Sequence, residues 1–183
     1  MIAYAITDLS TLNFQTLSTD IKRFSTKADM LLYRDKLTAN YATNAKLFIE
    51  ESKKYSFKKI LLHGDYALAK ELKADGVHLK STQFSDIEKA KALGLFTVIS
   101  THTVEEAKKA ELLGADMITF SPIFSTPNKS EPKGLEELKS LVVKLSIPVI
   151  ALGGIITQEQ IDACENTGAF AFASIRYFKD KTS

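Results

Sequence analysis

The sequence predicts an α/β fold, a compact single-domain (β/α)8 TIM barrel that spans residues 1–183 and ends in a truncated last helix. Eight short apolar runs recur about every 22 residues, and helix-like stretches separate them, which is typical of parallel βαβ units. The runs show little strict alternation, as expected of strands buried on both faces. In such a barrel, catalytic residues lie at the carboxyl ends of the strands.

The eight predicted strands are rich in Ile, Leu, Val and Phe. They cover residues 2–7, 29–34, 58–63, 76–79, 96–100, 117–121, 148–152 and 169–174. A typical barrel of this kind has about 250 residues, so a chain of 183 leaves room only for short loops. Little sequence follows the eighth run, and we expect the last helix to be a stub around residues 175–181.

Helix candidates occupy residues 41–55, 66–73, 85–93, 103–113, 135–145 and 158–167. Thr103 precedes acidic first-turn residues, which indicates an N-cap, and Ser85 with Glu88 has the spacing of a capping box. Glycines at Gly94, Gly114 and Gly168 are expected to end helices. The longest predicted loop, residues 125–133, reads equally as a lid over a ligand or as an irregular connection.

Composition excludes several classes of protein. The chain has 24 basic and 22 acidic residues, a balance that argues against nucleic acid or an anionic membrane as the main partner. No apolar run approaches the ~18 residues of a membrane span. The N-terminus lacks a signal-peptide pattern, and the one cysteine, Cys164, permits no internal disulfide, so we expect a reducing, cytoplasmic setting. The oligomeric state stays open, with a homodimer as one option.

Two cations follow the second predicted strand. Strand alternation places Arg34 and Lys36 on one face, together with Leu32. Arginine offers a planar fork for phosphate and lysine a point charge, so the pair predicts an anion clamp. The alternative is that both are ordinary solvated loop charges.

All three histidines, His63, His78 and His102, fall at predicted strand ends. Ser100 lies two residues before His102 and therefore on the same side of an extended segment. A neutral imidazole can transfer protons near pH 7 or bind a metal. The alternative is a hydrogen-bonded structural histidine.

Paired glycines, Gly153 and Gly154, follow the seventh strand, and Ser174, Ile175 and Arg176 follow the eighth. In these barrels the loops after strands seven and eight often form a phosphate site. Glycine lets backbone N–H groups approach the phosphate closely. A pair of glycines also occurs where a turn alone requires it.

Several motifs occur in order along the chain: Arg34-Asp35-Lys36, Gly76-Val77-His78-Leu79, Ser100-Thr101-His102-Thr103, Gly114-Ala115-Asp116, Ser121-Pro122-Ile123-Phe124-Ser125-Thr126-Pro127-Asn128-Lys129, and Ala151-Leu152-Gly153-Gly154-Ile155. Together they resemble the thiamine phosphate synthase/TenI family nearly from end to end. The resemblance also implies a (β/α)8 barrel.

The synthase of that family joins an aminopyrimidine pyrophosphate to a thiazole phosphate. Pyrophosphate leaves, and the thiazole nitrogen captures a carbocation-like pyrimidine. The resemblance implies a pyrophosphate site made by Arg34, Lys36 and Lys129, with Ser100 nearby. It implies a thiazole phosphate site made by Thr126, Asn128, Gly153, Gly154 and the turn Ser174, Ile175, Arg176.

The chain departs from the synthase pattern at the positions whose residues bind Mg²⁺ in the synthase. His63-Gly64 stands in place of an Asn-Asp pair, and the turn that begins at Lys80 lacks a second metal-binding aspartate. Leu32 replaces a glutamine of the pyrimidine region. We therefore expect no metal ligand and no cofactor, with Mg²⁺ only if the protein is a synthase that uses Asp65 as a shifted ligand.

The TenI branch, which contains a thiazole tautomerase, is similar to the chain at both places where the metal ligands are missing. Its acid/base histidine corresponds to Pro122, which cannot carry a proton. His102 and His63, with Lys36, are then the catalytic candidates.

The leading hypothesis is a metal-independent, TenI-like protein of thiamine biosynthesis that acts on a phosphorylated thiazole as a tautomerase. The second hypothesis is a divergent, Mg²⁺-dependent thiamine phosphate synthase that binds phosphorylated pyrimidine and thiazole. The third is a non-catalytic ligand-binding or regulatory protein. The fourth is another barrel enzyme that acts on a phosphate ester.

Overall fold

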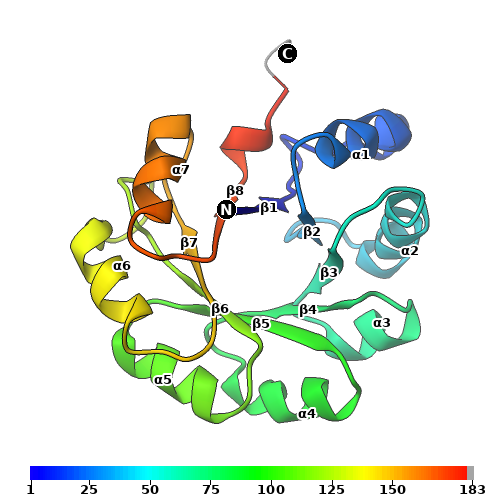
Figure 1. Ribbon diagram of the computed structural model, residues 1–183. Coiled ribbons are helices and arrows are strands. Elements are labelled where there is room, and N and C mark those ends of the chain that lie inside the picture. The colour runs from blue at the N-terminus through cyan, green and yellow to red at the C-terminus, as the bar shows by residue number, and fades with distance from the viewer. Residues whose placement is uncertain (181–183) are drawn as a thin grey trace.

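The fold is a closed barrel of eight parallel strands that pair in chain order, with β8 next to β1 (Figure 1). It is seen in a computed structural model that describes residues 1–180. The strands are β1(Ile2–Ile6), β2(Met30–Tyr33), β3(Lys59–His63), β4(Gly76–Leu79), β5(Phe96–Thr101), β6(Met117–Phe120), β7(Val149–Leu152) and β8(Ala171–Ser174). The predicted barrel is confirmed, and each predicted strand bound lies within two residues of the observed one.

Helices form a ring around the outside of the barrel (Figure 1). They are α1(Leu17–Ser25), α2(Tyr41–Ser52), α3(Tyr66–Glu71), α4(Ile87–Ala92), α5(Val104–Leu112), α6(Gly134–Val142) and α7(Gln158–Glu165). Short 3₁₀ turns complete the chain: η1(Phe14–Thr16), η2(Phe84–Asp86) and η3(Arg176–Phe178).

Helix α1 is absent from the sequence-based expectation. Its apolar side is short, with Ile21 and Phe24 buried, and its N-cap Thr16 makes no side-chain capping bond. Neither a long apolar stripe nor a clear start signal marked it.

Two predicted helix starts had different outcomes. The N-cap of α5 is confirmed, because the Thr103 hydroxyl accepts the N–H of Glu106 at 3.1 Å. The capping box of Ser85 and Glu88 is wrong, because Ser85 lies inside η2 and α4 begins after Asp86 without a side-chain cap. The three predicted helix-ending glycines all have positive φ.

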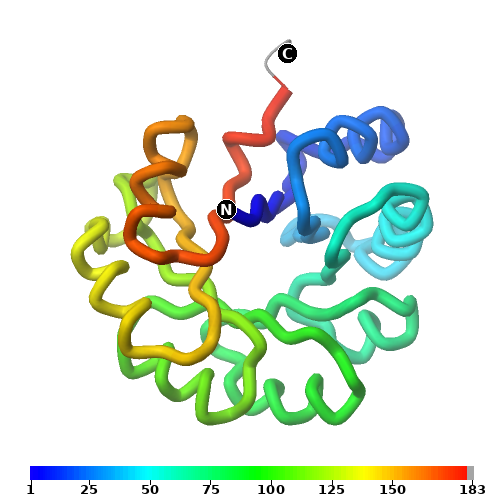
Figure 2. The backbone as a smooth tube through the Cα atoms, viewed as in Figure 1, coloured from blue at the N-terminus to red at the C-terminus, as the bar shows by residue number. Residues whose placement is uncertain are grey.

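The last helix is shorter than expected. Only the single turn η3 follows β8, and residue 181, the end of the predicted stub, lies outside the described residues. Figure 1 shows η3 in the gap between α7 and α1, where an eighth helix would lie. Phe178 of η3 packs against Phe24 and Phe172 and so covers this side of the barrel. Figure 2 shows that the chain circles the barrel once, so that its last strand, β8, lies beside its first, β1.

The barrel interior is apolar at its amino end and polar at its carboxyl end. Buried apolar side chains fill the interior below the carboxyl-end mouth, which we call the lower barrel: Tyr4, Ile6, Met30, Leu32, Leu61, Val98, Ile150, Ala171 and Ala173. The next inward positions of β2, β3 and β5 are Arg34, His63 and Ser100, since inward side chains recur every second residue. The polar positions therefore lie together at one mouth of the barrel.

Two further expectations concern Cys164 and membrane spans. Cys164 is a free, buried thiol in α7, and burial raises its pKa to about 11. Within residues 1–180, we find no helix with the length and apolarity needed to cross a bilayer.

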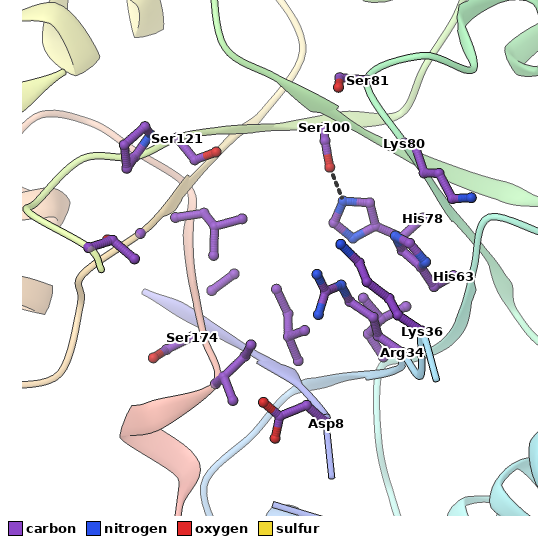
Figure 3. Close-up of a pocket in the computed structure, with 18 of the residues that line it drawn as sticks. Asp8, Arg34, Lys36, His63, His78, Lys80, Ser81, Ser100, Ser121 and Ser174 are labelled. Carbon is purple, nitrogen blue, oxygen red and sulfur yellow. Dashed lines mark hydrogen bonds between the residues drawn. The ribbon is translucent and has the colours of Figure 1, made fainter. Parts of the chain in front are cut away.

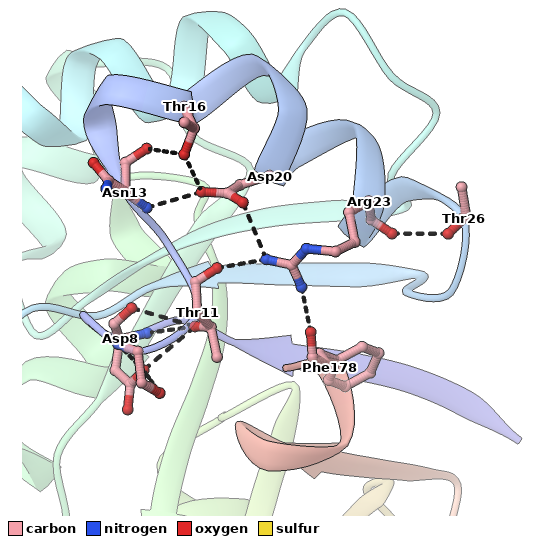
Figure 4. Close-up of polar contacts among 9 residues, drawn as sticks. Asp8, Thr11, Asn13, Thr16, Asp20, Arg23, Thr26 and Phe178 are labelled. Carbon is pink, nitrogen blue, oxygen red and sulfur yellow. Dashed lines mark hydrogen bonds and ion pairs between the residues drawn. The ribbon is translucent and has the colours of Figure 1, made fainter. Parts of the chain in front are cut away.

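Arg23 of α1 joins three parts of the chain (Figure 4). Its guanidinium donates to the carbonyl oxygens of Thr11 and Phe178 and to the carboxylate of Asp20. The Thr11 bond measures 2.6 Å and the Asp20 bond 3.3 Å. Arg23 thus ties η3 to the β1–α1 connection and supports the β8–β1 closure.

Replacing Arg23 by alanine should lower the free energy of unfolding by about 1–3 kcal/mol, because two carbonyl acceptors lose a charged donor. Urea denaturation measures this change. The control is Lys22→Ala on the same helix, whose side chain is exposed and should change stability by less than about 0.5 kcal/mol. Equal stability of the two variants would contradict the role of Arg23 in barrel closure.

Candidate functional site

A cavity of about 1290 Å³ opens at the carboxyl ends of the strands, and residues in or directly after all eight strands line it. Its position is the one that the barrel topology predicts for an active site.

The cavity contains nearly all of the predicted site residues. Its lining includes Arg34, Lys36, His63, Ser100, His102, Thr126, Lys129, Gly153, Gly154, Ser174, Ile175 and Arg176. Asn128 is not part of the lining; it lies in the loop between β6 and α6 with a left-handed backbone, φ 60°.

Five cations line the cavity. Arg176 follows β8, and the other four are Arg34, Lys36, Lys80 and Lys129. The pKa of Lys36 is lowered first by the charge of Arg34, then by burial and by the charges of Lys129 and Lys80. No ion pair joins any of the four to a carboxylate in the described chain. The four positive charges therefore favour an anionic ligand.

Lys80 is a site residue that the sequence analysis did not assign. Figure 3 shows it on the same side of the cavity as Arg34, Lys36 and His63, across from Ser174. The available signal was its spacing, because Lys80 lies two residues after His78 and shares its face of the strand.

The aspartates around the cavity accept hydrogen bonds from backbone N–H groups that follow them closely in the chain. Asp8 accepts the N–H of Ser10 at 2.9 Å, and Asp35 accepts the N–H of Leu37 at 2.9 Å. Asp65 is the N-cap of α3 and accepts from Leu68 at 2.8 Å.

No group of three or more His, Cys, Asp or Glu residues among 1–180 is arranged to hold a metal ion. Mg²⁺ prefers hard oxygen ligands in near-octahedral geometry. In proteins it is usually held by one or two carboxylates together with phosphate oxygens. The residues directly after β3 and β4 include one carboxylate, Asp65, and it already caps α3, so these two turns do not fit a magnesium ion held by the protein.

A buried chain of hydrogen bonds crosses the barrel below the cations. The hydroxyl of Tyr4 lies 2.9 Å from Nδ1 of His78, and Nε2 of His78 lies 3.0 Å from Oγ of Ser100 (Figure 3). Ser100 and His78 line the cavity, while Tyr4 is fully buried. Tyr4 was not predicted as part of the site because it belongs to an apolar strand sequence.

Two histidines are neutral at pH 7. Burial, followed by the charges of Arg34, Lys80 and Lys36, lowers the pKa of His63 to about 4. Burial, followed by His63 and Arg34, lowers the pKa of His78 to about 3. A neutral imidazole has one nitrogen that accepts and one that donates, so His78 can bridge Tyr4 and Ser100 by hydrogen bonds through its two ring nitrogens.

His102 directly follows β5, lines the cavity and is held by two hydrogen bonds. Its Nδ1–H donates to the carbonyl oxygen of Ser121 at 3.0 Å, and its backbone N–H donates to Glu106 at 2.6 Å.

Gly153 and Gly154 are needed for packing as well as for any ligand. Both have positive φ, and a Cβ atom at Gly153 would lie 2.7 Å from Cα of Pro122. One at Gly154 would lie 2.7 Å from Cβ of Phe124. The loop after β6 thus lies directly against the turn after β7.

The turn after β8 is similarly fixed. The hydroxyl of Ser174 donates to the carbonyl of Ile155 at 2.7 Å and accepts the N–H of Tyr177 at 3.1 Å. The predicted phosphate site is therefore a rigid arrangement of backbone, with Arg176 at its edge.

The family profile described as "Thiamine monophosphate synthase" matches residues 3–178. The chain belongs to this family. A "Putative thiamine-phosphate synthase 2" of Aquifex aeolicus is 42% identical over 130 residues, which are 69% of each chain. A "Thiamine-phosphate synthase" of Caldivirga maquilingensis is 41% identical over 56% of this chain and 51% of its own length.

A solved structure of similar fold is "Thiamine phosphate pyrophosphorylase" from Pyrococcus furiosus. It has a TM-score of 0.80 and 26% identity, over 95% of this chain and 85% of its own. These similarities confirm the resemblance read from the motifs. The family is one of transferases by the names of these members.

Acidification should destabilise the protein through His63 and His78. Their folded-state pKa values lie below the unfolded value near 6.5. Between about pH 6.5 and pH 4 the unfolded chain binds protons that the folded chain does not, so stability falls as pH falls. Unfolding in urea at pH 7 and pH 5 should show a smaller loss for His78→Gln than for the wild type.

Imidazole NMR signals provide the direct measurement. Those of His63 and His78 should show no titration between pH 8 and pH 5. A midpoint above pH 6 for either ring would contradict the burial argument.

Proposed function

We propose that the protein transfers a pyrimidine from a diphosphate ester to a thiazole phosphate, the reaction of a thiamine phosphate synthase. One observation carries this proposal: a group of cations and the turns after β7 and β8 line the same cavity. Arg34, Lys36 and Lys80 lie on one side, and Ser174 of the turn after β8 lies across from them (Figure 3). The names of the relatives support it.

The proposed reaction breaks the C–O bond between the pyrimidine methylene carbon and its diphosphate. The bonding electrons leave with the diphosphate, and the lone pair of the thiazole nitrogen forms a new C–N bond to the methylene carbon. Arg34, Lys36 and Lys129 would stabilise the negative charge that grows on the leaving group. The turns after β7 and β8 would hold the thiazole phosphate so that its nitrogen faces the reacting carbon.

Removing one of the cations should slow this transfer. Lys36→Ala should lower kcat/KM for thiamine phosphate formation by about 10²-fold, because a charge aimed at the leaving group is lost. The control Lys46→Ala removes an exposed charge from α2 and should have wild-type activity. Chromatographic detection of thiamine phosphate from the two substrates measures both. No product from the wild type would refute the transferase.

A second candidate, a thiazole tautomerase of the TenI type, is favoured by the Ser100–His78–Tyr4 chain of hydrogen bonds. In this reaction a proton leaves one position of a thiazole carboxylate phosphate and returns at another, with no change in charge. Ser100 could take the proton that leaves the thiazole while its own proton passes to Nε2 of His78, whose Nδ1 lies against Tyr4. The reverse transfer would return a proton at the other position of the thiazole and restore both side chains.

For the tautomerase, Ser100→Ala and His78→Gln should each reduce turnover of the thiazole carboxylate phosphate by about 10²-fold. Ser121→Ala, at another serine of the cavity, is the matched control and should retain activity. The absence of wild-type turnover would eliminate this candidate. Tight binding of thiazole phosphate without turnover in either assay would indicate a non-catalytic binding protein.

A further inference from the structure

Lys80 is held in place by the turn that follows β4. Its backbone N–H donates to Oε1 of Gln83 at 3.0 Å, and its carbonyl accepts the N–H of Gln83 at 2.9 Å. The Nε2 of Gln83 then donates to the carbonyl of Gly64 at 2.8 Å. The turn after β4 is therefore fixed against the residue that follows β3.

Because Gly64 has no side chain, the end of the Lys80 side chain can lie against it. A Cβ atom at Gly64 would lie 3.3 Å from Cε and 3.9 Å from Nζ of Lys80. Gly64 also has φ +78°, which L side chains rarely adopt. The ammonium group thus extends over Gly64 on the side of the cavity where Arg34 and Lys36 lie (Figure 3).

The charge around Lys80 is positive. Burial and the charges of Arg34, Lys80 and Lys36 lower the pKa of His63. The ring is therefore neutral at pH 7, and it does not balance the positive charge of Lys80. Asp65, the carboxylate directly after β3 and Gly64, caps α3 instead of pairing with Lys80. A ligand with several negative charges close together is what this arrangement can bind.

A diphosphate fits this requirement better than a single carboxylate or phosphate. Its oxygens are spread over two linked groups, which matches cations that come from three places in the chain: β2, β4 and the loop after β6. Enzymes commonly neutralise such groups with Mg²⁺ held by one or two carboxylates. The residues directly after β3 and β4 include one carboxylate, Asp65, and it caps α3 instead.

We propose that Lys80, extended over Gly64, supplies the positive charge that a divalent metal would otherwise provide, so that Arg34, Lys36, Lys80 and Lys129 bind a diphosphate group without metal. This inference rests on the proposed transferase, for which it names the group bound and the residue that replaces the metal. Lys80 would contact the leaving diphosphate and is in that sense catalytic.

Calorimetric titration of the full chain with inorganic pyrophosphate tests the inference, in EDTA and in Mg²⁺ at constant ionic strength. We expect binding in EDTA and at most a few-fold change with Mg²⁺. Lys80→Gln should weaken binding about 10-fold or more in EDTA, because a charged hydrogen bond is lost. Lys80→Arg keeps the charge and should bind within a few-fold of the wild type.

Lys46→Gln on α2 is the matched control for the loss of one lysine and should bind as the wild type does. Circular dichroism and urea unfolding of Lys80→Gln establish that it is folded. Wild-type binding that appears only with Mg²⁺, wild-type binding that is absent in both conditions, or unchanged affinity of Lys80→Gln would each overturn the inference.

The two proposals can fail separately. Pyrophosphate binding that depends on Lys80, together with no formation of thiamine phosphate, would refute the transferase and keep the anion site. Formation of thiamine phosphate only with Mg²⁺ would support the transferase and refute the metal-free diphosphate site.

Discussion

The pairing of β8 with β1 is the constraint on which the rest of the molecule depends. It places Tyr4 next to Ala173 and Ala5 next to Ser174, and it turns eight strands into one enclosed wall. The small side chain of Ala173 leaves room for the fully buried ring of Tyr4 inside the barrel. Because all strands run parallel, closure also gathers the side chains at their carboxyl ends around a single mouth. Residues far apart in the sequence, such as Arg34 and Lys129, meet only for this reason.

Bringing cations together in a cavity has a free-energy cost. Like charges disfavour one another, and the lowered pKa of Lys36 beside Arg34 is the direct sign of it. The apolar lower barrel and the outer helical layer offset that cost, since they bury most of the large side chains of the chain. An anionic ligand removes the repulsion when it binds. Affinity for anions at this mouth is therefore linked to the closed barrel and should weaken at high salt.

Much of the fold was predictable, because eight buried strands at regular spacing leave a strong pattern even in short runs. Helix α1 was not, since its contribution to the core comes mainly from Ile21 and Phe24 and its ends lack capping signals. The capping box at Ser85 failed for a related reason: a 3₁₀ turn takes up the first three residues of that helical segment, so the spacing of the motif no longer matches an α-helix.

The candidate site was predictable wherever a residue lies at the carboxyl end of a strand or directly after it. Arg34, His63 and Ser100 are such residues, and strand alternation alone places them in the cavity. Asn128 lies in a loop, where sequence spacing does not determine direction. Tyr4 was missed because its hydroxyl acts within the barrel core, and the closeness of Lys80 to Gly64 depends on a turn whose hydrogen bonds have no sequence signature.

The two departures from the metal-binding pattern at Gly64 and Lys80 belong together. A carboxylate at position 64 would have to share space with the Lys80 side chain, and the two would form an ion pair. Such a pair would leave neither a free carboxylate for a metal nor a free ammonium for a phosphate. The side of the cavity formed by Gly64 and Lys80 can thus bind a diphosphate either through a metal held by a carboxylate or through the lysine. A carboxylate beside Lys80 would cancel the charge of the ammonium group. The glycine at position 64 and the lysine at position 80 are therefore compatible with each other, since the absence of a side chain at Gly64 leaves room for the ammonium group of Lys80.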